Sequence, residues 1–120
     1  MNKLLILLAL GTGLSATALA DAPKVVGGHF VDENGMTLYT FDKDIAPGKS
    51  MCMGGCATKW PAALASDSDK ASGDWSLIKS SNGQSQWAYK GKPLYRWSMD
   101  KKAGDTTGEG FAGFWHTAKP

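Results

Sequence analysis

A ten-residue pattern occurs twice in the chain, 56 residues apart, and it restricts the fold more than any other feature. Residues 35–44 align without gaps with residues 91–100, and both segments fit Gly-x-x-Leu-Tyr-x-(Phe/Trp)-x-x-Asp. The shared positions are Gly35, Leu38, Tyr39, Phe41 and Asp44 in the first copy, and Gly91, Leu94, Tyr95, Trp97 and Asp100 in the second. Two copies are too few for an open array, so we expect repeat units at about 28–65 and 85–118 to complete one shared core.

Each copy of the pattern predicts a β-hairpin. In the first copy, residues 29–31 run into the turn Asp32-Glu33-Asn34-Gly35, in which Asn-Gly is a strong signal for a tight connection between strands. In the second copy, residues 86–89 precede the turn Lys90-Gly91-Lys92, and residues 93–97 leave it. We therefore expect a mainly β fold, a compact antiparallel domain of two pseudo-repeated hairpin units.

The aromatic residues of the pattern are expected in the core. Side chains two positions apart lie on the same face of a strand. Tyr39 therefore shares a face with Phe41. In the second copy Tyr95 shares a face with Trp97, and Arg96 points to the opposite side. The rings are thus structural residues, and the arginine between two of them is directed away from the core.

The composition beyond residue 20 favours strands and turns over long helices. Only nine Val, Ile or Leu residues remain there, together with all 12 aromatic residues and 13 glycines. A core assembled from these residues is mainly aromatic, because each ring buries about 150–250 Å². No stretch shows a sustained apolar period of 3.6 residues. The one helical element that we expect is a short turn near residues 57–64.

Residues 1–20 have the pattern of a signal peptide. A lysine precedes an unbroken apolar run at residues 4–10, and Ala18-Leu19-Ala20 gives the small-x-small pattern that predicts cleavage before Asp21. The run is shorter than the ~20 residues that a membrane span needs, and neither cysteine lies near the cleavage site. We expect a periplasmic or secreted protein with one domain over residues 21–120 and no membrane anchor in the mature chain.

The two cysteines lie between the copies, in the segment Met51-Cys52-Met53-Gly54-Gly55-Cys56. In an oxidising compartment such a pair is usually a disulfide, and the glycines allow so short a ring to close. Soft sulfur ligands select Cu(I), so a copper site at Met51, Cys52, Met53 and Cys56 is one alternative, and thiol redox activity is another. The spacing differs from C-x-x-C-H, which excludes covalent attachment of c-type haem.

Asp44 and Asp100 each follow the last aromatic residue of the motif by three positions. A carboxylate at such a position accepts backbone N–H groups and closes its own loop. The alternative is a calcium site that uses Asp42 and Asp44. Calcium needs six to eight oxygen ligands, and the second copy places two lysines between Asp100 and Asp105. Loop closure is therefore the role that we expect of both motif aspartates.

Charge and motif content exclude several classes of function. The chain has 13 Lys and Arg residues against 11 Asp and Glu residues, a balance that argues against a nucleic-acid-binding protein. It contains no G-x-S-x-G, H-E-x-x-H or P-loop motif, and its two histidines have no recognisable partner motif. We expect a protein without enzymatic activity and without a cofactor.

The motif set resembles the bacterial secreted-repeat family, which is described as predicted lipoproteins with a Yx(F/W/Y)xxD motif. The resemblance rests on the duplicated motif, on Cys52-x₃-Cys56-Ala-x-x-Trp60-Pro61, on Gly104-Asp-Thr-Thr-Gly108 and on Trp115-His116. It covers about residues 28–116. This chain lacks the cysteine of a lipobox, so the membrane anchoring of lipoproteins is not carried over. The family has no established activity, and the resemblance implies an architecture and no reaction.

Two functions remain for such a chain. The first is a non-enzymatic module of the cell envelope or periplasm that binds an envelope partner or ligand through an aromatic surface, or that has a structural role. The second is a periplasmic copper-binding or thiol-redox protein that uses the Cys52–Cys56 loop.

Overall fold

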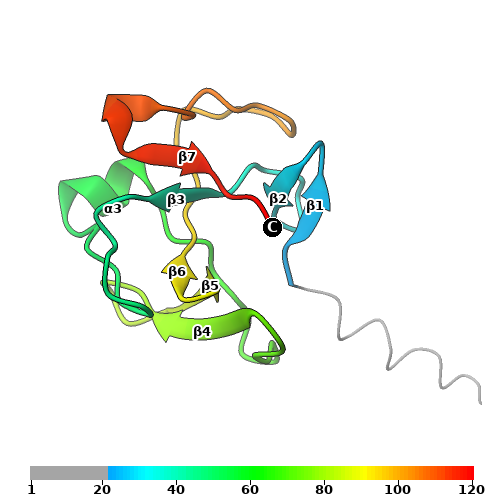
Figure 1. The fold of residues 1–120 in the computed structure, drawn as a ribbon, viewed down its shortest axis with the longest axis vertical. Helices are drawn as coiled ribbons and strands as arrows, with labels where there is room; N and C mark the ends of the chain where they lie inside the picture. The colour runs from blue at the N-terminus through cyan, green and yellow to red at the C-terminus, as the bar shows by residue number, and fades with distance from the viewer. Residues whose placement is uncertain (1–21) are drawn as a thin grey trace, which may run out of the picture.

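A computed structural model describes residues 22–120 of the chain (Figure 1). The expected signal peptide and its cleavage site before Asp21 lie outside these residues. The described part contains no helix that is both long enough and apolar enough to cross a membrane.

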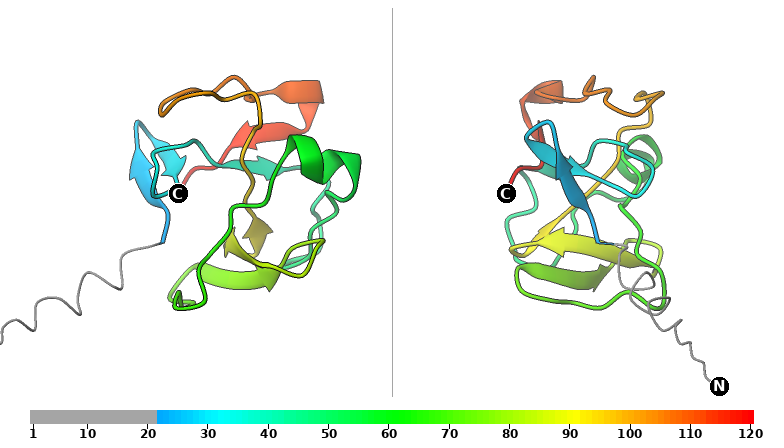
Figure 2. Two further views of the ribbon diagram at one scale, coloured as in Figure 1. Left: turned by 180° about the vertical axis from the view of Figure 1, so that it is seen from behind. Right: turned by 90° about the vertical axis from the view of Figure 1, so that its right-hand side faces the viewer.

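Short antiparallel strands form most of the regular structure. β1 (Lys24–Val26) pairs with β2 (His29–Val31), and β3 (Tyr39–Phe41) pairs with β7 (Trp115–Thr117). The third sheet has the order β4 (Trp75–Lys79), β5 (Ser85–Tyr89) and β6 (Lys92–Pro93). The β1–β2 and β4–β5 hairpins lie on different sides of the β3–β7 pair (Figures 1 and 2). The expected mainly β, antiparallel fold is confirmed.

The hairpins that carry the motif are shorter than the sequence suggests. In the first copy, Val31 forms an isolated bridge with Thr37 across the Asn-Gly turn. The chain then leaves the hairpin, because the next residues, β3, pair with β7 from the second repeat. In the second copy, only Ala88 and Tyr89 of β5 pair with β6. Pairing within each hairpin therefore ends close to its turn, and the motif strands continue toward the other repeat.

The two repeats exchange backbone hydrogen bonds at equivalent positions. Tyr39 and Tyr95 each donate an N–H to the other's carbonyl oxygen, at 2.8 and 3.0 Å. Ala118 of the second repeat donates to Leu38 O at 2.8 Å, and Ala63 of the first donates to Leu94 O at 2.9 Å. The final segment of each repeat is thus hydrogen-bonded to the motif strand of the other. Because buried backbone groups need partners, each repeat completes its hydrogen bonding only with its neighbour.

The core consists of two clusters, and both draw on both repeats. One is centred on Leu38 and Leu94, each fully buried, with Phe30 and Trp87 beside them. The other is aromatic and contains the following buried residues: Tyr39, Cys52, Trp60, Tyr95, Trp97 and Trp115. The expected placement of the motif rings is observed for Tyr39, Tyr95 and Trp97, and the half-buried Phe41 stacks on Trp115 at 4.2 Å between centroids.

Trp60 lies at the centre of the aromatic cluster. Its ring stacks on Trp115 with centroids 3.8 Å apart, and on Trp97 at 4.1 Å. Gly108 approaches these rings so closely that a Cβ atom there would lie 2.7 Å from Trp60 and 3.0 Å from Trp97. The stack therefore requires a residue without a side chain at position 108.

The helical turns lie just ahead of the final segment of each repeat. α3 spans Gly55–Lys59, and the 3₁₀ turn η2 spans Phe111–Gly113. A short helix was expected near residues 57–64, whereas α3 begins before residue 57 and ends before residue 64. Pro61 disfavours a helical conformation at Trp60, and beyond it Ala62 and Leu64 form bridges with the second repeat. Pairing with strands of the other repeat replaces helix over the later part of the expected range.

Candidate functional site

Each motif tyrosine hydrogen-bonds to the motif aspartate of the other repeat. Tyr39 Oη donates to Asp100 Oδ2 at 2.7 Å, and Tyr95 Oη donates to Asp44 Oδ2 at 2.6 Å. The second carboxylate oxygen accepts a backbone N–H seven residues along its own chain, from Met51 for Asp44 and from Thr107 for Asp100. We call these two Tyr–Asp pairs the cross-repeat clamp. Each aspartate closes its own loop and also ties the two repeats together.

Burial keeps the two tyrosines of the clamp protonated. It raises the pKa of the Tyr39 and Tyr95 hydroxyls, and the acceptor carboxylates add to the increase, so both tyrosines remain protonated donors. Burial also raises the pKa of the Asp44 carboxyl, although its hydrogen bonds from Tyr95 and Met51 act in the opposite direction. All four carboxylate oxygens accept hydrogen bonds, so both motif aspartates hold segments of the chain together.

The cysteines form the expected disulfide. Cys52 and Cys56 are bonded, with their Cα atoms 5.2 Å apart. Cys52 is buried in the aromatic cluster, whereas the side chains of Met51 and Met53 are exposed. Within residues 22–120, no group of three or more His, Cys, Asp or Glu side chains is arranged to hold a metal ion. In this state the two cysteine sulfur atoms are bonded to each other and are not thiolates.

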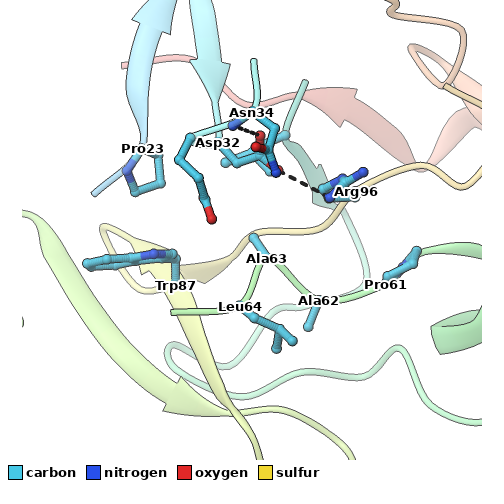
Figure 3. Close-up of a pocket in the computed structure, with 11 residues that line it drawn as sticks. Pro23, Asp32, Asn34, Pro61, Ala62, Ala63, Leu64, Trp87 and Arg96 are labelled. Atoms are coloured by element: carbon cyan, nitrogen blue, oxygen red, sulfur yellow. Dashed lines mark hydrogen bonds and ion pairs between the residues drawn. The ribbon is translucent and has the colours of Figure 1, made fainter. Parts of the chain in front are cut away.

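A cavity of about 230 Å³ lies between the Asp32–Asn34 turn and the segment Pro61–Leu64. Figure 3 shows Asp32 and Arg96 on one side and Pro61, Ala62 and Leu64 opposite, with Trp87 and Pro23 toward one end. We call this cavity the Arg96 pocket. Its walls combine an apolar surface with three charged side chains, the basic Arg96 and the acidic Asp32 and Glu33. An apolar wall with a few polar groups is the usual composition of a small-ligand site.

Arg96 is held at this cavity by a carboxylate that the turn positions. Asp32 Oδ1 accepts the N–H groups of Asn34 and Met36, which fixes the carboxylate as the closure of the turn. Its Oδ2 faces Arg96 Nη1 at 3.3 Å. Strand alternation correctly predicted that Arg96 points away from the rings, but the sequence alone did not reveal the cavity. The residue that could have indicated the cavity is Asp32, whose carboxylate closes its own turn and also pairs with Arg96.

A second cavity of about 280 Å³ occupies the equivalent position in the other repeat. Leu38 lines the Arg96 pocket and its equivalent Leu94 lines the second cavity, while Arg96 is replaced there by Thr40. Three lysines also line it: Lys90, Lys92 and Lys119. We call it the lysine pocket. The sequence pattern placed Lys90 and Lys92 only in a turn and indicated no role for Lys119.

His116 forms a separate charged cluster at the surface. Its Nε2 lies 2.9 Å from Asp42 Oδ2, and its Nδ1 lies 3.2 Å from Glu109 Oε2. The two carboxylates raise the pKa of the imidazole. Glu109 Oε1 also accepts the N–H of Thr117. The cluster links β7 to the end of β3 and to the loop before η2.

Comparison with known proteins identifies the architecture. A family model, Lipoprotein_15, described as a secreted repeat of unknown function, matches residues 24–64 and again residues 76–119. The chain belongs to this family. No curated protein matches the chain, and no solved structure does.

The two secreted-repeat matches correspond to the two halves of the fold. Each includes one copy of the motif and a preceding hairpin, and they begin at β1 and close to the start of β4, which carry no motif residues. The resemblance deduced from the sequence is thereby confirmed. The description of the family as secreted supports export of this chain. Membership of the secreted-repeat family carries no reaction, so the function has to be argued from the pockets.

Proposed function

We propose that this secreted-repeat protein is a non-enzymatic binding module of the periplasm or cell envelope, and that the Arg96 pocket holds its ligand. The observation that carries the proposal is the placement of Arg96. It is the only arginine in the chain, it lies at the edge of a cavity, and its side chain is 39% exposed. Among residues 22–120, its side chain has one recorded partner, Asp32.

The walls of the pocket indicate the chemical class of the ligand. A guanidinium group offers five N–H donors in a planar fork that matches a carboxylate, and the contact with Asp32 uses only part of that capacity. The exposed Leu64 lines the same pocket, and Pro61 and Trp87 extend its apolar wall. Asp32 and Glu33 also line the cavity, so the negative charge of a ligand is favoured only at the guanidinium group. We infer a small organic carboxylate with a compact apolar group, seated with its charge at Arg96 and its apolar part against residues 61–64.

An aromatic binding surface, which the sequence suggested, has little support. Trp60, Trp87, Trp97 and Trp115 are all at least 93% buried, and they form the core. Among the aromatic side chains of residues 22–120, those of Phe111 and Phe114 are the most exposed. This is why we assign binding to the Arg96 pocket.

The proposal is tested by titrating the full chain with N-acetyl-leucine and following backbone amide shifts by NMR. We expect shifts centred on residues 61–64 and on Arg96, and none with N-acetyl-leucinamide, which lacks the carboxylate. Arg96→Lys keeps the charge but loses the fork, and is expected to weaken binding at least about tenfold. Lys79→Gln, at an exposed position on β4, is the control. Equal affinity for the acid and the amide, or an unchanged Arg96→Lys variant, would refute the assignment.

The proposed non-enzymatic role and the copper alternative are open to separate tests. Turnover of any substrate in an unbiased hydrolase or oxidoreductase screen would overturn the non-enzymatic proposal. Copper binding remains a prediction, favoured only by the exposed thioethers of Met51 and Met53 on either side of Cys52. It requires reduction of the Cys52–Cys56 disulfide. Uptake of Cu(I) by the reduced protein that is lost in a Met51→Leu, Met53→Leu variant would support it.

A further inference from the structure

The lysine pocket differs from its counterpart in charge while sharing its position. The Arg96 pocket is lined by two acidic side chains and one basic side chain, Asp32, Glu33 and Arg96. The lysine pocket is lined by Lys90, Lys92 and Lys119, with no Asp or Glu among its described lining residues. None of these lysines forms an ion pair within residues 22–120. All three lysines are exposed, and Lys90 Nζ lies 5.4 Å from the ring centroid of Tyr89, which also lines the cavity. Three positive charges at one cavity repel each other, and a bound anion reduces that repulsion.

Lys90 occupies a backbone position that disfavours lysine. It has φ 49° in the two-residue connection between β5 and β6, where it is followed by Gly91 at φ 83°. Connections of this kind prefer Asn or Gly at both central positions, because other side chains are strained at positive φ. The equivalent residue of the first repeat is Asn34. A strained lysine at the edge of a cavity is an outlier of the kind that marks functional positions.

We propose that the lysine pocket is a second binding site, specific for a phosphate group. Lysine ammonium groups bind phosphate as point charges, and the half-buried Thr40 adds a hydroxyl at the position that Arg96 occupies in the other pocket. The phosphate is carried either by a free inorganic or small organic phosphate, or by the headgroup of an anionic phospholipid. This site is separate from the Arg96 pocket and does not depend on its function.

Calorimetric titration of the full chain with pyrophosphate, and sedimentation with phosphatidylglycerol vesicles, distinguish the two sources. Binding of pyrophosphate assigns a free phosphate, and sedimentation with phosphatidylglycerol but not with phosphatidylcholine vesicles, without pyrophosphate binding, assigns the lipid headgroup. Either result should weaken as salt is raised. We expect Lys92→Gln and Lys119→Gln each to weaken binding about five- to tenfold, and the control Lys79→Gln to leave it unchanged.

Lys90→Asn provides a readout that a purely structural role would not give. Because Asn tolerates positive φ, this variant is expected to melt about 2 °C or more above the wild type while binding the phosphate probe more weakly. Arg96→Gln should leave phosphate binding unchanged, and the lysine variants should leave N-acetyl-leucine binding unchanged, so failure of one site is separable from failure of the other. Absence of binding to both probes, or equal binding by wild type and all three lysine variants, would overturn the proposal.

Discussion

Removing the motif aspartates should affect the two repeats unequally. Asp100 is 6% exposed, and its carboxylate is the one acceptor recorded for the fully buried hydroxyl of Tyr39 among residues 22–120. Tyr95, in contrast, has a second partner, because Ser50 Oγ lies 2.6 Å from its hydroxyl. In Asp100→Ala the Tyr39 O–H loses its acceptor, whereas in Asp44→Ala the Tyr95 O–H can donate to Ser50.

The magnitudes follow from these contacts. A buried donor without an acceptor costs about 1–3 kcal/mol, and each lost hydrogen bond at an exposed loop costs about 0.5–1.5 kcal/mol. Asp100→Ala leaves the Tyr39 hydroxyl without an acceptor and also removes the hydrogen bond from the exposed Thr107. We therefore expect the free energy of unfolding to fall by about 2–4 kcal/mol. Asp44→Ala releases only the exposed Met51 N–H in the same way, and we expect about 0.5–1.5 kcal/mol. The first value is a large part of the roughly 5–15 kcal/mol that stabilises a small domain.

Urea unfolding of the wild type and the two variants at neutral pH measures this difference. Asp67→Ala is the matched control, because Asp67 is exposed and is in no ion pair or side-chain hydrogen bond of the described part. Asp100→Asn should lie between wild type and Asp100→Ala, since an amide retains one accepting oxygen. Equal losses for Asp44→Ala and Asp100→Ala, or wild-type stability for both, would refute the clamp as the role of the motif.

Three further outcomes are expected. The carboxylates around His116 raise its pKa. The stabilisation that they provide is therefore complete below the unfolded pKa of about 6.5 and is lost as the pH rises through the folded pKa. The melting temperature of His116→Gln should lack this dependence between pH 6 and 8. Replacing Cys52 and Cys56 with serine should lower the free energy of unfolding by about 2 kcal/mol, the chain-entropy value for so short a ring, with no further loss on adding a reductant. Gly108→Ala should destabilise the tryptophan stack by about 1–3 kcal/mol, whereas Gly55→Ala, in α3 with open space at its Cβ, should be neutral or stabilising in the same denaturation assay.

The sequence predicted those features of the fold that depend on local pattern. Strand alternation predicted that Tyr39 and Tyr95 lie in the core and that Arg96 points outward. The oxidising compartment implied by the signal peptide predicted the Cys52–Cys56 disulfide. Pairing between the repeats was beyond such rules. A local pattern does not state which strand β3 joins, since any edge with a free row of backbone groups and a matching face is acceptable. Asp44 was for the same reason assigned only a bond within its own loop.

The differences between the two copies follow from the geometry of the interlocked fold. Leu38, Tyr39 and Asp44 are identical to their equivalents in the second repeat, and the backbone of Tyr39 meets that of Tyr95 directly, so a change in either tyrosine alters both sides of one contact. Thr40 and Arg96 are also equivalent, but each lines a different cavity, and neither has to fit the other. The motif strand thus alternates between positions that tie the repeats together and a position that faces a pocket. Duplication with this geometry keeps one core while leaving two pockets free to differ, which is why the Arg96 pocket and the lysine pocket have different charges on the same frame.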